Sequence, residues 1–172
     1  MNNIQIIDGD ITAATVDAIV NAANPMLLGG GGVDGAIHKS AGPKLLEECL
    51  KIRPVRKIRC PVGEARITLA GDLPSRYVIH AVGPKYHREE IPEQLLAAAY
   101  ISSLKLALDN SCESIAFPAI SCGSYGYPIR EAAKVALQAC RDSKFKGIDI
   151  YFYLYGQKNY GIWQSVLDSR NI

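Results

Sequence analysis

Four consecutive glycines, Gly29 to Gly32, separate an apolar segment from an amphipathic one. Glycine loses more backbone freedom on folding than any other residue, and it is destabilising by roughly 0.5–1 kcal/mol relative to alanine inside a regular element. Such a run is expected only where the backbone must approach something that side chains would keep away. Because Asp34 follows at an expected helix start, the run predicts a strand, a glycine loop and a helix N-terminus in series.

A second glycine loop has the same arrangement. Gly123 and Gly126, in SCGSYGYP, follow the strand-like segment 114–120 and precede a helix expected from Pro128. Helix N-termini carry unpaired N–H groups and a partial positive charge, and glycines let the backbone come within hydrogen-bond distance of a phosphate. In open α/β sheets, ligands bind outside the carboxyl ends of the strands. Two such loops predict a site for a diphosphate.

Strand-like and helical patterns alternate along the rest of the chain. Strands are expected at 3–7, 17–23, 64–70, 77–83, 114–120 and 148–155. One helix is expected from about Val33 to Leu50, and others over 92–110, from Pro128 through Cys140, and at the C-terminus. The predicted buried helical residues are Leu96, Tyr100, Leu104, Leu108, Ile162, Trp163, Val166 and Leu167. The alternation predicts an α/β sheet of about six strands, covered on both faces.

Composition excludes several classes of protein. Hydrophobic residues make up 48% and charged residues 21%, as in ordinary globular domains. No apolar run approaches the ~18 residues of a membrane span. The first twenty residues contain no Lys or Arg, which argues against a signal peptide, so we expect a cytoplasmic protein. The five cysteines show no CxxC pair and no zinc spacing, which predicts reduced, mostly buried thiols and no structural metal.

Positive charge is concentrated in one segment. The net charge is +2, which by itself suggests no nucleic-acid partner, and the segment KIRPVRKIR at 51–59 carries five of the 19 basic residues. This segment either attracts an anionic partner or is a solvated helix end and loop. The second interpretation is favoured, because a local charge run is usually a solvated surface.

Two familiar nucleotide and hydrolase motifs do not fit. Gly30, Gly32 and Gly35 satisfy GxGxxG, but the region about twenty residues on, where a dinucleotide-binding fold places an acidic residue, is the basic segment LKIRPVRKIR. The segment NAANPMLL also separates the strand from the glycines. Neither GxxxxGK[ST] nor GxSxG occurs in the sequence. A dinucleotide-dependent oxidoreductase is therefore disfavoured.

The motifs GDIT (9–12), NAAN (21–24), GGGGVDGAIH (29–38), YVIHAVGP (77–84) and SCGSYGYP (121–128) together resemble the macrodomain family. They are most similar to its MacroD-type branch of ADP-ribosyl hydrolases and O-acetyl-ADP-ribose deacetylases. The resemblance covers nearly the whole chain in the family's order. It implies a single three-layer α/β/α macrodomain over 1–172 with a mixed sheet, and a cleft for ADP-ribose or an ADP-ribosylated protein. It implies no metal and no cofactor. We also expect a monomer without a membrane partner or a specific nucleic-acid partner.

The resemblance also implies roles for individual residues. Catalysis is implied for Asn24, which matches a residue near the distal ribose, and for Asp34. Substrate binding is implied for Asp10, Ile11, Gly30, Gly31, Gly32, Val33, Ser121, Cys122, Gly123, Ser124, Tyr125 and Tyr155. Of these, Asp10 matches the acceptor of the adenine amino group, Tyr155 an aromatic against adenine, and Tyr125 an aromatic over the distal ribose. Cys122 and Ser124 depart from the family's usual threonine and branched apolar residue, a difference that bears on substrate preference.

Each polar candidate also has a structural interpretation. Asp10 has the position of a cap for a short helical turn, and Asn24 that of a turn residue before Pro25. Asp34 has the position of an N-cap at a helix start, and the helix N-terminus would stabilise its carboxylate and make it a weak base. It would then orient a water or a ribose hydroxyl, with a substrate phosphate oxygen sharing the proton removal.

The two histidines nearest these motifs have weaker claims. His38 follows Asp34 by one helical turn, where a structural and a chemical role are equally expected. His80 is expected to be a packed strand residue. A thiol nucleophile at Cys122, activated by either histidine, is disfavoured because no third orienting group is evident. Two hypotheses remain, a hydrolase and a non-catalytic ADP-ribose-binding module. The presence of both Asn24 and Asp34 favours the hydrolase.

Overall fold

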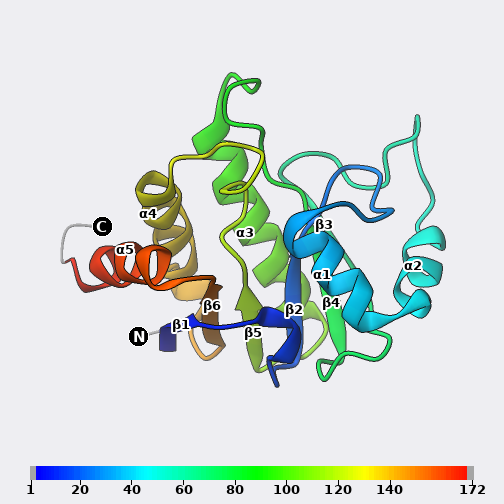
Figure 1. Cartoon of the computed structure of the whole chain (residues 1–172), viewed down its shortest axis with the longest axis horizontal. Helices are drawn as coiled ribbons and strands as arrows, with labels where there is room; N and C mark the ends of the chain where they lie inside the picture. Colours follow the sequence, from blue (N-terminus) through cyan, green and yellow to red (C-terminus); the bar gives the residue numbers. More distant parts are fainter. Residues whose placement is uncertain (1–2, 170–172) are drawn as a thin grey trace.

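The structure is a computed structural model of the chain and describes residues 3–169. Within that range the centre is a six-stranded sheet in the order β1-β6-β5-β2-β4-β3 (Figure 1). The strands are β1 (Asn3–Asp8), β2 (Ala18–Ala22), β3 (Ala65–Leu69), β4 (Tyr77–Ala81), β5 (Ser114–Phe117) and β6 (Asp149–Leu154). All neighbours pair in parallel except β3, which is antiparallel to β4. The expected mixed sheet of about six strands is confirmed.

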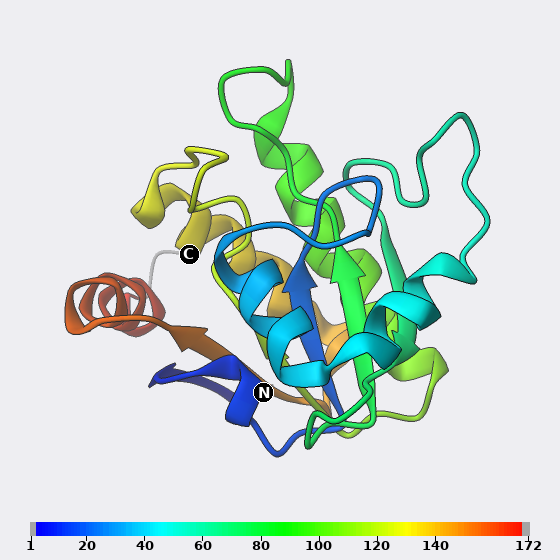
Figure 2. The same ribbon diagram turned by 45° about the vertical axis from the view of Figure 1, so that its right-hand side comes forward.

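Helices cover both faces of this sheet. The helices α3 (Pro92–Asp109), α4 (Ile129–Cys140) and α5 (Gln157–Asp168) form one outer layer, in which α4 packs against both α3 and α5. The helices α1 (Gly32–Ala41) and α2 (Pro43–Leu50) lie on the other side, where α1 contacts β2 and α2 contacts β3. Figure 2 shows α1 and α2 in front of β2 and β4, with α3 behind them. The three-layer α/β/α arrangement is therefore confirmed.

The single helix predicted from Val33 to Leu50 is wrong, because the chain forms two helices there. The break lies at Gly42, whose φ of 75° is in the left-handed region. Pro43 begins α2, and a proline disfavours helical backbone at the residue before it. A Cβ at position 42 would also lie 2.8 Å from Asp72 Oδ2. The Gly-Pro pair thus turns the chain so that α2 reaches β3.

Each helical layer has its own apolar core. Beneath α3–α5 the core is aromatic: the rings of Phe117 and Phe152 stack with centroids 5.5 Å apart, and Tyr100 and Trp163 pack around them. Beneath α1 and α2 the core is aliphatic and includes Ile19, Leu27, Ile37, Leu45 and Val78. Each fully buried side chain of this size contributes about 1.5–3 kcal/mol to folding.

Most predicted buried residues of the long helices are confirmed, with three exceptions. Leu96, Tyr100 and Leu104 are fully buried, but Leu108, the last residue but one of α3, is 41% exposed. In α5, Trp163 and Val166 are buried, whereas Ile162 and Leu167 are only partly covered. These exceptions share a cause, since a helix that lies on the surface buries only the narrow stripe that faces the sheet.

The fold also shows the surroundings of the cysteines and of the basic segment. All five cysteines are free thiols, and four of them are buried. The basic segment 51–59 leaves the end of α2 as a largely exposed loop, as favoured above, and Arg59 is the only one of its basic residues that is partly buried. Its side chain donates to the carbonyl oxygens of Ile52 and Met26, which ties this loop to the one after β2. No helix within residues 3–169 has the length and apolar character needed to cross a bilayer.

Candidate functional site

A cleft of about 840 Å³ lies at the carboxyl ends of the central strands. Its walls are the loop between β2 and α1 and the loop between β5 and α4, the two glycine loops singled out in the sequence. The adjoining end of β6 forms one limit of the cleft. Every residue predicted for the site lines it: Asp10, Ile11, Asn24, Gly30, Gly31, Gly32, Val33, Asp34, Ser121, Cys122, Gly123, Ser124, Tyr125 and Tyr155.

The sequence reasoning missed several lining residues. Gly83 and Pro118 form part of the wall, as do Tyr153 and Asn159. Gly83 and Pro118 follow β4 and β5, so the rule that ligands bind at strand ends contained a signal for them. Asn159 lies in the first turn of α5, and its amide donates to the carbonyl of Tyr155. No motif in the sequence marked Asn159.

The first glycine loop is held against the start of α1. Gly31 is the N-cap and Gly32 the first helical residue, so backbone N–H groups of this turn face the cleft. The N–H of Gly35 donates to the carbonyl of Gly31 at 3.2 Å. A Cβ on Gly35 would lie only 2.7 Å from the carbonyl oxygen of Gly30. Glycine at position 35 therefore allows the loop to fold onto its own helix.

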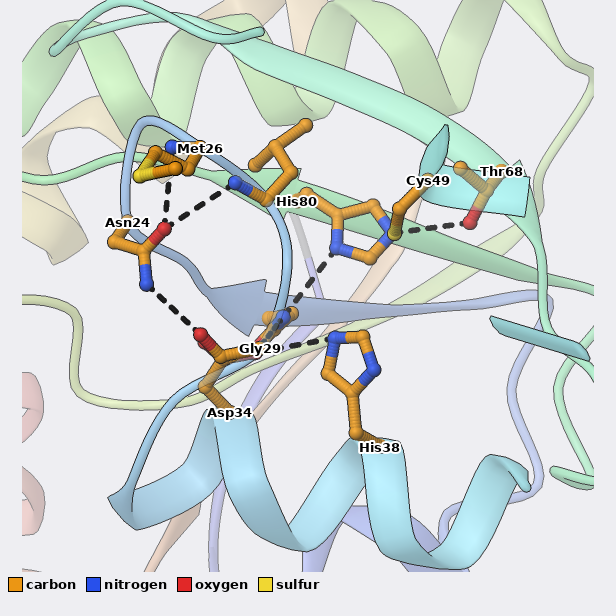
Figure 3. Close-up of polar contacts among 10 residues, drawn as sticks. Asn24, Met26, Gly29, Asp34, His38, Cys49, Thr68 and His80 are labelled. Atoms are coloured by element: carbon orange, nitrogen blue, oxygen red, sulfur yellow. Dashed lines mark hydrogen bonds and ion pairs between the residues drawn. The ribbon is translucent and has the colours of Figure 1, made fainter. Parts of the chain in front are cut away.

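Asn24 organises the loop between β2 and α1. Its Oδ1 accepts hydrogen bonds from the N–H groups of Met26 and Leu27 at 3.1 and 3.2 Å. Its Nδ2 donates to the carbonyl of Gly29 at 3.0 Å (Figure 3). The structural interpretation of Asn24 as a turn residue is thus confirmed. An amide nitrogen carries two hydrogens, so one remains for a ligand in the cleft.

Asp34 is buried, and its two oxygens face different surroundings. Oδ1 accepts a hydrogen bond from Asn21 Nδ2 at 2.8 Å and lies 3.4 Å from His38 Nε2. Oδ2 is directed toward the glycine loop, because a Cβ on Gly30 would lie 3.1 Å from it. Asp34 is the third residue of α1 and not its N-cap, so the cap role considered for it is wrong. The hydrogen bond from Asn21 holds Oδ1 on the side away from the cleft, and Oδ2 faces the cleft.

Burial raises the pKa of the Asp34 carboxyl above its ordinary value. The hydrogen bond from Asn21 and the charge of His38 act in the opposite direction but do not cancel this effect. This direction is opposite to that expected from a helix N-terminus, because loss of hydration disfavours the charged carboxylate. A carboxylate with a raised pKa is a better proton acceptor than a solvated one.

The second glycine loop is braced by the segment after β4. Ser121 has a φ of 67° and is buried beneath the loop, beside Gly83. The N–H of Tyr127 donates to the carbonyl of Ser121, and the N–H of Tyr86 donates to the carbonyl of Tyr125, both at 2.9 Å. Lys85 Nζ lies 5.4 Å from the centre of the Tyr125 ring. This lysine near the cleft was not predicted from the sequence.

The cysteine of this loop has no catalytic partner. Cys122 Sγ contacts the carbonyl of Ile120 at 3.6 Å, and burial raises the pKa of the thiol to about 12. His80 instead contacts Sγ of Cys49, a buried residue of α2, at 3.6 Å (Figure 3). The pKa of His80 is lowered to about 3 by its burial, so the ring is neutral at physiological pH. The disfavoured thiol nucleophile is not assembled in this fold.

The opposite end of the cleft presents a carboxylate and an aromatic ring. Asp10 caps the short 3₁₀ turn η1 (Ile11–Ala13): its Oδ1 accepts from Thr12 N at 2.9 Å and from Thr12 Oγ1 at 2.7 Å. The cap interpretation is confirmed, and Oδ2 is left for another donor. Tyr155 follows β6 and is 82% exposed. A flat ring and a carboxylate at one end of the cleft suit an adenine base.

The chain is similar to known proteins over most of its length. The Macro domain family model matches residues 20–136. A macro domain-containing protein of Vibrio parahaemolyticus is 56% identical over 167 residues, which cover 97% of this chain and 98% of that protein. A protein of Escherichia coli K12 named O-acetyl-ADP-ribose deacetylase is 49% identical over 168 residues, covering 95% and 94% of the two chains.

Solved structures show the same fold. The Oceanobacillus iheyensis macrodomain with ADP superposes with a TM-score of 0.92 at 44% identity, covering 96% of this chain and 90% of the other. The Trypanosoma brucei macrodomain in complex with ADP-ribose superposes with a TM-score of 0.84 at 38% identity, covering 96% and 69% of the two chains. The similarity therefore extends over nearly all of the described fold.

Proposed function

Because the chain belongs to the macrodomain family, we propose that it binds ADP-ribose in the cleft and hydrolyses esters of ADP-ribose. The substrates are O-acetyl-ADP-ribose and ADP-ribosyl esters of Asp and Glu side chains on proteins. The name of the Escherichia coli relative supports the first of these. Residues 1–172 act as a single catalytic domain in this proposal.

The placement of ADP-ribose follows from the chemistry of the cleft walls. The diphosphate lies between the two glycine loops, where N–H groups of the first turn of α1 are free to donate. The adenine stacks on Tyr155 and donates its amino group to Asp10. The distal ribose then reaches Asn24 and the ring of Tyr125, which places the ester bond near Asp34.

The single observation that carries the proposal is the orientation of Asp34. Its Oδ2 faces the loop expected to hold phosphate, and it accepts no hydrogen bond from any residue in 3–169. A buried negative charge beside a diphosphate opposes binding of the ligand. A protein that only bound ADP-ribose would gain affinity by losing this carboxylate. Its presence is explained if it acts in the reaction, where an interaction made in the transition state raises the rate.

The residues divide the work of hydrolysis as follows. Asp34 Oδ2 accepts a hydrogen bond from the attacking water or from a ribose hydroxyl, which orients it toward the ester. Asn24 donates its remaining amide hydrogen to the ribose. The water oxygen attacks a carbon of the ester C–O bond, and a proton of the water passes to Asp34 or to a phosphate oxygen of the substrate. The C–O bond breaks and a proton is returned to the released oxygen, so that the products are ADP-ribose and a carboxylic acid.

The test uses the two substrates separately. The protein is incubated with O-acetyl-ADP-ribose and with a glutamate-ADP-ribosylated protein, and the release of ADP-ribose is followed by chromatography. Conversion of either substrate supports the proposal, and the ratio of the two rates identifies the preferred class. Micromolar ADP-ribose binding by calorimetry without turnover of either substrate would replace the hydrolase with a binding module. An absorbance change with a nicotinamide cofactor would favour the oxidoreductase.

A further inference from the structure

A buried row of polar groups runs from Asp34 into the protein, away from the cleft. Asn21 Nδ2 lies 2.8 Å from Asp34 Oδ1 and 3.3 Å from His80 Nδ1. On the other side of the imidazole, His80 Nε2 lies 3.0 Å from Thr68 Oγ1. Asn21, His80 and Thr68 are all buried, and they come from the adjacent strands β2, β4 and β3. Figure 3 shows Thr68 and Cys49 beside the ring of His80.

The donors and acceptors of this row leave one consistent arrangement. An ionised carboxylate only accepts, so the atom of Asn21 that faces Asp34 is the NH₂ group. The second hydrogen of that group points to His80 Nδ1, which must therefore carry a lone pair. The proton of the neutral imidazole is then on Nε2, from which it is donated to the hydroxyl of Thr68. If the ring were protonated, the N–H of His80 Nδ1 would face the N–H of Asn21 Nδ2, and both groups are donors.

The orientation of the Asn21 amide depends on these contacts alone. Its Oδ1 is buried and has no hydrogen-bond partner among the described residues, so nothing on that side selects oxygen over nitrogen. If the amide turned over, its oxygen would face both the Asp34 carboxylate and the lone pair of His80. Asp34 selects the same orientation, but only while it is ionised. The lone pair of His80 Nδ1 selects that orientation as well, as long as the ring proton stays on Nε2, where the hydroxyl of Thr68 accepts it.

We propose that His80 is a positioning residue for the hydrolysis: its Nδ1 holds the Asn21 amide in the orientation that donates to Asp34, which directs the other carboxylate oxygen into the cleft. This role rests on the proposed function, because it acts through Asp34. It differs from simple packing in that it requires an acceptor at the position of Nδ1. A ring of the same size without that acceptor would fill the space and lose the effect.

Other ionisable groups also face this row. His38 lies on α1 beside Asp34, with its ring centre 6.5 Å from that of His80. Burial, and to a lesser extent the charge of Asp34, raise the pKa of Tyr125 on the second loop and of Cys49 on α2. His80 reaches Asp34 through the Asn21 amide. A change confined to position 80 therefore reports on the amide.

Three variants separate the role of the acceptor from that of packing. His80→Phe keeps a ring and removes the acceptor, whereas His80→Asn places an amide oxygen near the position of Nδ1. Val78→Ala is the control for packing, because Val78 is buried two residues earlier on the same face of β4, opposite Thr68, and has no polar group. All three are expected to lower the unfolding temperature, which calorimetry records.

Hydrolysis and titration provide the functional readouts. We expect His80→Phe to lower the single-turnover rate on O-acetyl-ADP-ribose about tenfold at neutral pH, equivalent to one hydrogen bond. ADP-ribose affinity should change by less than about threefold, and the acid limb of the rate profile should move to higher pH. His80→Asn should recover most of the rate, and Val78→Ala should leave the acid limb unchanged. A folded His80→Phe protein with the wild-type rate and acid limb would overturn the proposal.

A measurement on the wild-type protein does not depend on folding of the variants or on turnover. Nitrogen-15 spectra of the histidine rings report the protonated nitrogen directly. We expect His80 to remain the neutral Nε2–H tautomer from pH 5 to 8. A proton on Nδ1, or titration of the ring within that range, would overturn the proposal. If the tautomer is as expected and no substrate is hydrolysed, the proposed function fails while the arrangement of the row stands.

Discussion

Asn21 Nδ2 donates to Asp34 Oδ1 at 2.8 Å, and this bond divides the carboxylate into an inner and an outer oxygen. The inner oxygen also lies near His38, whereas the outer one faces Gly30 and the cleft. A carboxylate held in this way keeps one oxygen in a fixed place without using the atom that would meet the substrate. Fixed placement of a proton acceptor is what oriented-water catalysis requires.

The first prediction concerns recognition of the base. Asp10→Ser should keep a side-chain oxygen to cap η1 but remove the carboxylate oxygen that is free to accept the adenine amino group. Because a hydrogen bond to a charged group is worth about 1.5–3 kcal/mol, ADP-ribose affinity should fall roughly 10- to 100-fold. Calorimetry on ADP-ribose and its inosine counterpart checks this. Equal affinity of the wild type for the two ligands would rule out the adenine role of Asp10.

The second prediction concerns the first glycine loop. Gly35→Ala places a methyl group 2.7 Å from the Gly30 carbonyl oxygen, so the loop must move outward. We expect ADP-ribose affinity to fall about tenfold, within the range of about 1–3 kcal/mol for overpacking. Gly161→Ala in α5 is the control, because its Cβ would meet no atom within 4 Å. Unchanged affinity in the Gly35 variant would show that the loop position does not govern binding.

The third prediction concerns the cysteine of the second loop. Cys122→Thr should leave turnover within a few-fold of the wild type, because the thiol has a pKa raised to about 12 and no histidine partner. Rates are measured under single-turnover conditions together with an unfolding curve. A loss of several orders of magnitude in a folded protein would restore the thiol as a nucleophile.

The fourth prediction concerns stability and pH. The pKa of His80 is lowered by burial from 6.5 to about 3 in the folded protein. Between these two values the unfolded chain binds the extra proton, so the folded state loses stability as the pH falls. The loss attributable to His80 is about 1.4 kcal/mol per pH unit below about pH 6. Urea unfolding of wild type and His80→Asn between pH 7 and 5 measures it. If the free energies of unfolding of the two proteins changed by the same amount with pH, the prediction would be contradicted.

Much of the fold and the cleft was predictable because the signals are local. The strand before Gly29 and the helix after Gly32 set the first glycine loop within about twenty residues of sequence, and the second loop repeats the pattern. The break at Gly42 also carried a local signal in the following proline. The partial exposure of Leu108 depends instead on how narrow a stripe of α3 faces the sheet, which an i, i+4 pattern does not record.

The surroundings of Asp34 depend on tertiary contacts and were not predictable. His80 and Thr68 meet because β3 and β4 pair in one antiparallel register, with Thr68 opposite Val78 and Arg66 opposite His80. Cys49 arrives from α2, whose direction depends on the break at Gly42. The raised pKa of Asp34 likewise follows from burial, whereas sequence position alone suggested the effect of a helix end.

The central claim is that Asp34 and Asn24 serve the reaction more than the binding of ADP-ribose. The direct test is single-turnover hydrolysis of O-acetyl-ADP-ribose by Asp34→Asn and Asn24→Ala, paired with calorimetry on ADP-ribose. Each variant should lose about 100-fold or more in rate. ADP-ribose affinity should hold or improve for Asp34→Asn, which removes a charge beside the diphosphate. It should fall by at most about tenfold for Asn24→Ala, which loosens its loop. Wild-type rates in both variants, or equal losses of rate and affinity in Asp34→Asn, would contradict the account.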